Sequence, residues 1–291
     1  MPGFRHILFP TDFSERSRAF RPLVQLVARQ FQAKLTVFHA VPVPSGDYGD
    51  LAGLFPSMTD IAMLEEKIAG VLEEFFPDAE ATGIPELDRE TALGDPAVTI
   101  GDYARAEGAD LIMMATHGRG RFRNLLMGSV ASKVLHDAEC PVWTATHGED
   151  PALLSNLGIK NILAAVDLAP DQIEVVSRSA ELAREFGGAV RLLHAVPSAE
   201  HVPGDTGGSE FSNFLLRSAQ EQIEKLQREA GTNFEVLVRP GSVTEAIRDA
   251  ALESQADLVV LGRGRVREAF GRLLSRTYDI IGASPCPVLS L

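Results

Sequence analysis

One segment of the chain has residue types and a spacing suited to holding a phosphate group. Gly128 and Ser129 open a predicted helix, which follows a short apolar run ending at Met114. Free N–H groups and the dipole at a helix N-terminus favour an anion, glycine lets a ligand approach the backbone, and the serine hydroxyl adds a donor. Asp12 follows another apolar run and is suited to accept hydrogen bonds from ribose hydroxyls. Spacing alone therefore indicates a phosphate near an adenine-sized slot.

Other catalytic and metal-binding motifs do not occur in the sequence. It contains neither a Gly-x-x-x-x-Gly-Lys-Ser/Thr phosphate loop nor a Gly-x-Ser-x-Gly nucleophile turn. The seven histidines include no pair at i, i+4, and neither cysteine stands in a Cys-x-x-Cys setting, so no metal site is predicted. His39 and His194 end equivalent strands, and we interpret both as structural. His117 stays open between a phosphate contact and a plain loop residue.

The chain states one pattern twice. Asp12 lies 27 positions before His39, and Asp167 lies 27 positions before His194, so the segments match at an offset of 167 − 12 = 155. In both copies the histidine is followed by Ala-Val-Pro. Two matched half-chains predict two copies of one domain, and differences between the copies are informative about function.

Length and composition fit two ordinary globular domains. We predict domains at 1–147 and 159–291, joined by a linker at 148–158, and each has room to bury its own core. No apolar run reaches the ~20 residues of a membrane-spanning helix, and the N-terminus lacks a signal-peptide pattern. With two sparse cysteines, Cys140 and Cys286, the expected location is the cytoplasm. The net charge of −13 argues against nucleic-acid and membrane partners.

Short apolar strands alternate with amphipathic helices in each copy. This order predicts an α/β fold with two tandem open parallel five-stranded sheets and helices on both faces. The last strands of the two copies would lie at sheet edges, so we expect them to pair about a pseudo-twofold axis. In the first copy, we expect strands at 6–9, 34–39, 87–93, 110–114 and 141–144, and helices at 14–30, 61–75, 96–103 and 129–137.

With these residues in view, the chain resembles the universal stress protein family, as two tandem family domains. Nucleotide-binding members carry Gly-x-x-Gly-(nine residues)-Gly-Ser/Thr at this place. Here the match is Ala115-x-x-Gly118-(nine residues)-Gly128-Ser129, with one glycine replaced by alanine. The resemblance implies a Rossmann-like, adenine nucleotide alpha hydrolase-like fold and ATP as the cofactor, with or without Mg²⁺. The predicted cofactor-binding residues are Pro10, Thr11, Asp12, Val41, Met114, Ala115, Gly118, Arg119, Gly128, Ser129 and Val130.

The resemblance also implies a part for each group of these residues. Val41 and Met114 would line the adenine, Asp12 would meet the ribose, and the turn at 128–130 would hold the phosphates. The methyl group of Ala115 would crowd the ligand if the backbone there needed a conformation open only to glycine.

The second copy departs from this pattern, and we predict that it binds no ATP. Its loop is contracted to Gly262-x-Gly264, and Leu274 stands where the first copy has Gly128. The leucine side chain, and any loss of a positive φ at that position, would obstruct a close phosphate contact. Asp167 keeps the carboxylate. A smaller anion stays an alternative, with Arg263, Arg265 and Arg267 as its candidate ligands.

Three function classes follow from these observations. The leading hypothesis is a cytoplasmic, ATP-binding stress regulator or scaffold, in which ATP orders the segment 119–127 and alters contact with an unidentified protein partner. The second is a nucleotide-independent interaction module. The third is a slow ATPase or adenylating enzyme, for which we find no obvious general base, so at most weak hydrolysis is expected. Beyond the intramolecular pseudo-dimer, a further homodimer is left open.

Overall fold

The computed structural model of the chain describes residues 3–42, 58–76, 78–116, 127–145, 158–169, 172–196, 208–263 and 272–291. The chain divides into two compact units, Pro2–Val142 and Trp143–Leu291 with Met1. The predicted linker at 148–158 lies almost wholly outside the described residues. The domain bounds and the pairing of the two last strands stay predictions, and each half is described by itself below.

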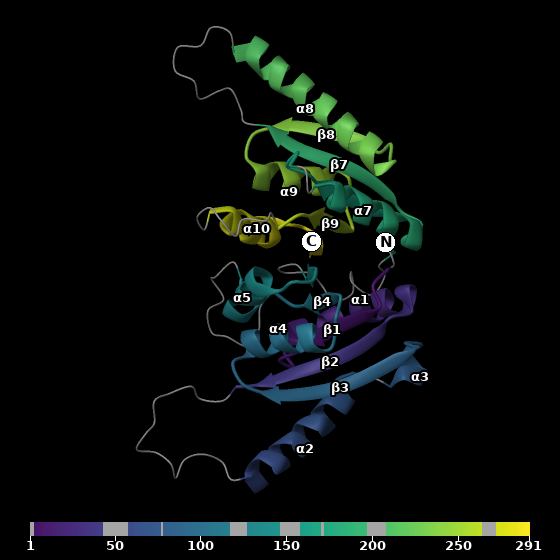
Figure 1. The fold of residues 1–291 in the computed structure, drawn as a ribbon, viewed down its shortest axis with the longest axis vertical. Helices are drawn as coiled ribbons and strands as arrows, with labels where there is room; N and C mark the ends of the chain where they lie inside the picture. Colours follow the sequence, from purple (N-terminus) through teal and green to yellow (C-terminus); the bar gives the residue numbers. More distant parts are fainter. Residues whose placement is uncertain are drawn as a thin grey trace. The chain divides into compact units, whose positions relative to one another are not determined.

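The first half of the chain alternates strands and helices as the sequence predicts (Figure 1). Its strands lie in the order β3-β2-β1-β4-β5, and the pairs β1–β2, β1–β4 and β2–β3 are parallel. The single-turn helix α3 was not predicted from the sequence. The elements are β1 (His6–Pro10), α1 (Glu15–Phe31), β2 (Lys34–Val41), α2 (Met58–Phe75), α3 (Ala79–Thr82), β3 (Glu86–Leu93), α4 (Pro96–Ala106), β4 (Leu111–Met114), α5 (Ser129–Asp137) and β5 (Val142–Thr144).

The second half repeats this architecture. Its strands are parallel and lie in the order β10-β9-β6-β7-β8, which confirms the predicted α/β class. The first strand of this half, β6, is central, as β1 is in the first half. The elements are β6 (Asn161–Ala165), α7 (Ile173–Phe186), β7 (Ala189–Val196), α8 (Gly208–Ala230), β8 (Glu235–Pro240), α9 (Val243–Glu253), β9 (Leu258–Leu261), α10 (Arg272–Ala283) and β10 (Val288–Ser290).

Strand register shows that the two halves are equivalent residue by residue. In the first half Ile7 pairs with Leu111, and in the second Ile162 pairs with Leu258. The sequence offset is therefore 155 for the first strand and helix of each half, and 258 − 111 = 147 for the fourth strand. Positions related by these offsets can be compared directly.

Helices cover both faces of each sheet. In the first half α4 packs against α5, while α1 meets α2 on the other side through Arg21 and Phe75. In the second half α7 packs against α8, and α9 packs against α10. Parallel strands covered on both sides become continuous apolar runs. The residues Ile7, Leu8 and Phe9 of β1 are accordingly all fully buried.

Arginines from other elements bind the free carbonyl groups at the C-terminal end of α2. The last turn of α2 contains no Lys or Arg, which would normally interact with the exposed carbonyls there. Instead, Arg21 of α1 donates to the carbonyl oxygen of Phe75, and Arg89 of β3 donates to that of Phe76 (2.8 Å). These contacts fix α2 against the rest of the first half.

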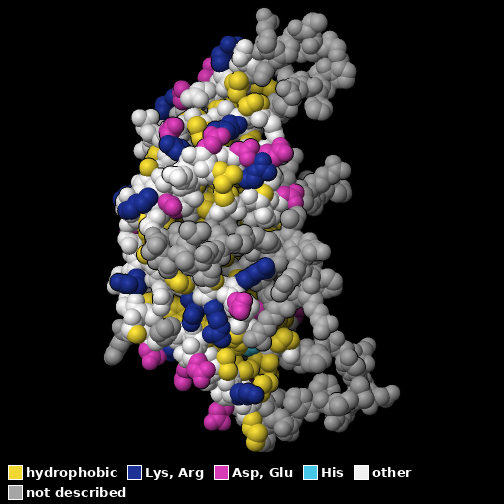
Figure 2. Space-filling model, turned by 180° about the vertical axis from the view of Figure 1, so that it is seen from behind, with side chains coloured by type: hydrophobic (Ala, Val, Ile, Leu, Met, Phe, Trp, Pro, Cys, Tyr) yellow, Lys and Arg dark blue, Asp and Glu magenta, His cyan; other side chains and the backbone are white. Residues whose placement is uncertain are grey.

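Charged side chains of both signs are interspersed on the described part of the face in Figure 2. Some are paired locally, as Lys34 is with Glu86 (2.8 Å) and Asp88 (2.6 Å). Hydrogen bonds to these two carboxylates, of which Asp88 has the larger effect, raise the pKa of Lys34 above its ordinary value. Among the described helices, none has the length and apolar character that crossing a membrane requires.

Candidate functional site

The predicted site residues that end or follow β1, β2 and β4 lie at the carboxyl ends of three adjacent strands. β1 lies between β2 and β4, so the residues following it stand beside Val41 at the end of β2 and Met114 at the end of β4. In open parallel sheets, ligands bind at this edge, where the strand order reverses. Thr11 and Met114 are buried, whereas Asp12 and Val41 are half-buried and so remain accessible to a ligand.

Asp12 is held in place by the start of α1. Its Oδ1 accepts hydrogen bonds from the backbone N–H of Ser14 (3.1 Å) and from the Ser17 hydroxyl (2.8 Å). Ser14 is the N-cap of α1, as the sequence predicts, and its side chain accepts from the Ser17 N–H. The intervening Phe13 has φ = 61°, a left-handed conformation that a bulky residue rarely adopts. The backbone of this turn is therefore strained at Phe13, and the two hydrogen bonds to Oδ1 hold the Asp12 carboxylate in one orientation.

His39 fastens this turn to the neighbouring strand. Its Nδ1–H donates to the carbonyl oxygen of Thr11 at 2.7 Å, and because a carbonyl can only accept, the proton must lie on Nδ1. The imidazole also stacks on the Phe13 ring, with the ring centroids 4.5 Å apart. These contacts support the structural interpretation of His39.

The second half has the equivalent histidine hydrogen bond. His194 donates from Nδ1 to the carbonyl oxygen of Val166 at 2.7 Å, and Leu168, the counterpart of Phe13, has φ = 66°. Asp167, however, is exposed and accepts from the N–H of Ala169 (3.0 Å). The two turns thus share a backbone and differ in how their carboxylates are held. The hydrogen bonds from these histidines to the first-strand ends were not predicted from the sequence, where the repeated spacing of the histidines from the aspartates was the only signal for them.

The predicted phosphate-binding turn lies at the N-terminus of α5, as expected. Gly128 is the N-cap of the helix and has no side chain with which to cap the first turn, and its N–H donates to the Thr116 carbonyl (2.9 Å). The bond to Thr116 holds the turn beside the end of β4. Ser129 is exposed and Val130 is half-buried. Backbone N–H groups in such a turn can bind a phosphate.

The expectation that Gly128 needs a positive φ is wrong. Its φ is −69° and its ψ is 149°, an extended conformation open to any residue. Conformation therefore does not exclude the leucine of the second half, Leu274. That residue lies within α10 rather than before it, so the helix there begins earlier than α5 does in the first half.

Several residues of the two predicted loops lie outside the described residues. They are His117, Gly118 and Arg119 in the first half, and Gly264, Arg265 and Arg267 in the second. Arg263 is described, and its Nε lies 3.3 Å from the carbonyl oxygen of Leu291, to which its N–H also donates. In the described ranges, no group of His, Cys, Asp and Glu is arranged to hold a metal ion.

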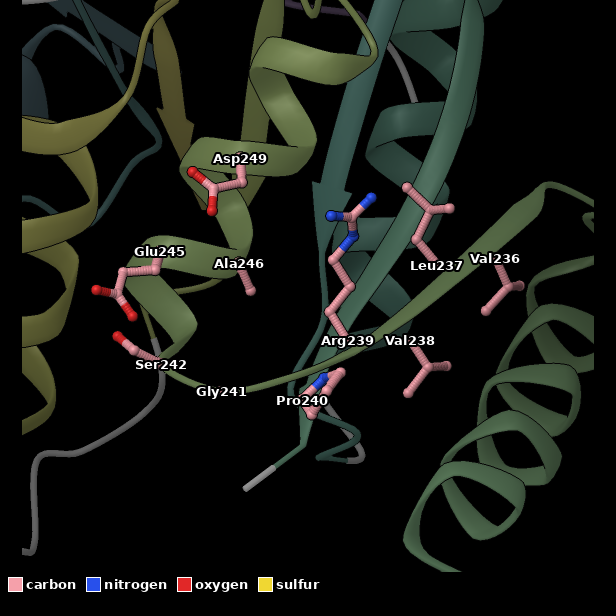
Figure 3. A pocket seen from close by; sticks show the side chains of 10 residues that line it. All are labelled: Val236, Leu237, Val238, Arg239, Pro240, Gly241, Ser242, Glu245, Ala246 and Asp249. Carbon is pink, nitrogen blue, oxygen red and sulfur yellow. The ribbon is translucent and has the colours of Figure 1, made fainter. Parts of the chain in front are cut away.

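A cavity of about 620 Å³ lies in the second half, between β8 and α9, and no sequence prediction addressed it. Figure 3 shows Arg239 extending from β8 beside Asp249 of α9, with Val236 and Val238 directed towards α8. Arg239 donates to both carboxylate oxygens of Glu253, and Asp249 accepts from Arg248 (2.9 Å). Most of the charge around this cavity is therefore already compensated.

Fold and site together define a tandem α/β protein in which each half has a central first strand beside its fourth, β1 with β4 and β6 with β9. Open parallel sheets bind ligands in the crevice beyond the carboxyl ends of such a strand pair, and this edge is called the crevice of each half below. The model of the universal stress protein family matches residues 3–145 and 158–291, and the chain belongs to that family.

Individual relatives match one half of the chain. A universal stress protein of Thermus aquaticus is 36% identical over 141 residues, covering 48% of this chain and 96% of its own. Universal stress protein MJ0531 of Methanocaldococcus jannaschii is 30% identical over 139 residues, covering 48% and 80%. The crystal structure of a universal stress protein from Archaeoglobus fulgidus aligns over 100% of this chain and 97% of its own, with a TM-score of 0.69 and 23% identity. That last likeness shows the tandem fold.

Proposed function

We propose that this universal stress protein binds ATP, with or without Mg²⁺, in the crevice of its first half and acts in the cytoplasm as a nucleotide-responsive regulator or scaffold. The observation that carries the proposal is the presence of an oriented carboxylate and a helix N-terminus with a glycine N-cap at one sheet edge. Asp12 is held by two hydrogen bonds, and Gly128 is tied to the end of β4. An adenine nucleotide offers both a ribose for the first and phosphates for the second.

The described residues at the crevice fit the parts proposed for them. Val41 and Met114 are apolar and end the strands on either side of β1, where they would line an adenine. Asp12 would accept from the ribose hydroxyls, and the N–H groups at 128–130 would donate to phosphate oxygens. The predicted contacts of Gly118 and Arg119 belong to the same proposal. ATP phosphates at this place would lie beside the basic segment that precedes α5, and so would change the surface offered to a protein partner.

The test is to count and then titrate the bound nucleotide. Purified protein is denatured, the released nucleotide is identified by chromatography, and the emptied protein is titrated with ATP by calorimetry. We expect about one ATP or ADP per chain. Asp12→Ala should weaken ATP binding at least about tenfold, because it removes a charged hydrogen-bond acceptor. Gly128→Leu, which copies the second half into the first, should weaken it too.

Asp167→Ala is the matched control, since it removes the equivalent carboxylate from the second half. Its ATP affinity should equal that of the wild type. Two nucleotides per chain would contradict the assignment to the first half. If no nucleotide co-purifies and titration detects no ATP binding, then ATP binding is refuted and the interaction module is favoured.

A further inference from the structure

A buried glutamine lies at the carboxyl edge of the second sheet. Gln172 precedes α7 and is only 3% exposed, although glutamine is usually a surface residue. Its side chain does not cap α7, and the amide makes no hydrogen bond within the described part of the chain. Its structural contribution there is volume.

That volume lies against Gly262, the residue that follows β9. A Cβ atom added at Gly262 would stand 2.8 Å from the Gln172 Nε2 and 3.4 Å from a methyl group of Val175. Gly262 is not among the glycines with a positive φ, so the backbone itself would accept alanine. A methyl group at position 262 would therefore require the glutamine amide to shift, because the amide occupies the space beside the glycine.

The first half has the opposite arrangement at the same two places. By the offsets of 155 and 147, the counterpart of Gln172 is Ser17, and that of Gly262 is Ala115. Ser17 is short, and its hydroxyl is engaged with Asp12 (2.8 Å). The second half thus combines a large residue, Gln172, with a glycine, whereas the first half has the smaller Ser17 and an alanine at the same two positions.

We infer that Gln172 closes the second crevice, so that this chain has one receptive crevice and one filled by its own side chain. The amide packs at the end of β9, beside β6, which is the edge corresponding to the proposed ATP site between β1 and β4. A ligand there would have to expel a packed side chain, and a core resists such added volume. The statement that the first crevice is receptive rests on the proposed ATP site. The closure of the second crevice by Gln172 does not depend on that proposal.

The closure is tested without nucleotide, by a double-mutant cycle on thermal unfolding of the full chain. Gly262→Ala should lower Tm by about 2–4 °C in the wild type, because its new methyl group meets the buried amide. In the Gln172→Ser background the same substitution should have almost no effect. An equal effect of Gly262→Ala in both backgrounds overturns the inference, whether or not the protein binds ATP.

The blocking effect is tested by moving the pair into the first half. The double variant Ser17→Gln/Ala115→Gly should weaken ATP binding by at least about tenfold. The single variants Ser17→Ala and Ala115→Gly measure what loss of the hydroxyl and of the methyl group contributes without added bulk, and the double variant should bind ATP more weakly than either of them. Wild-type affinity in the double variant overturns the inference. A wild type that binds no ATP, together with a coupled cycle, refutes the proposed function and supports the closure.

Discussion

At the scale of single residues, the candidate site depends on two contacts of His39 that join the end of β2 to the turn after β1. The Nδ1–H of His39 bonds to the carbonyl that precedes Asp12, and its ring stacks on the left-handed Phe13. A residue in this conformation is stable only where its surroundings hold it, so the histidine keeps the aspartate turn in its observed shape.

We expect His39→Ala to lower stability by about 1 kcal/mol and to weaken ATP binding several-fold, because one half-buried hydrogen bond and the support of Asp12 are lost. Calorimetric titration and thermal unfolding measure the two effects. His39→Asn should restore part of the affinity, since its amide can donate from nearly the same place.

His194→Ala is the control for that variant. It breaks the same bond in the second half, so it should lower stability to a similar extent and leave ATP affinity unchanged. Should His39→Ala bind ATP as the wild type does, His39 would have no part in positioning Asp12.

At the scale of elements, equivalent helices begin in chemically different ways. Asp95 is the N-cap of α4, and its carboxylate accepts from the N–H groups of Ala97 and Val98 (both 3.1 Å). Its counterpart Ser242 is the N-cap of α9, without any side-chain cap bond. The N–H of Val98, and then the ammonium of Lys133, lower the pKa of Asp95 below its ordinary value of 3.8.

Asp95→Ala should therefore lower Tm by about 1–4 °C at pH 7, whereas Ser242→Ala should change it little. A carboxylate whose folded-state pKa is depressed stabilises the fold above its unfolded pKa and stops doing so as pH falls through the folded value. The Tm difference between wild type and Asp95→Ala should thus shrink below pH 3.8. A difference that stays constant down to pH 2 would show that the carboxylate's charge is not involved.

At the scale of the whole molecule, two copies of one fold carry crevices of different character. Strand order and register are the same in both halves, so strand pairing does not distinguish them. The differences lie in side chains, as with Ser17 against Gln172, and in where the last helix begins, with an N-cap glycine in one half against a leucine inside α10 in the other.

ATP should accordingly protect one half of the chain. At 100 times its Kd, a ligand stabilises its own folding unit by about 2.7 kcal/mol, which slows globally exchanging amides by up to about a hundredfold. In hydrogen-exchange mass spectrometry, peptides from β1, β4 and α5 should gain protection, while those from β6, β9 and α10 should change little. Equal protection of both halves would mean that ATP binds to each or that the halves unfold together.

The sequence by itself determined the repeat, the class of each half and the strand ends at which the site residues meet. These features follow from local patterns, namely apolar runs, helix caps and the recurring aspartate and histidine spacing. The predicted N-cap Ser14 and the helix start after Gly128 are found in the structure. Such features depend on neighbouring residues, so a pattern in the chain is enough to predict them.

Tertiary structure alone decided the character of the two crevices. The extended backbone at Gly128, the bond from His39 to Thr11 and the contact of Gln172 with Gly262 were not predicted from the sequence. The last two join residues that strand pairing brings together from distant parts of the chain, and the backbone at Gly128 is fixed by its bond to Thr116. Whether a buried side chain leaves or fills a space depends on that packing.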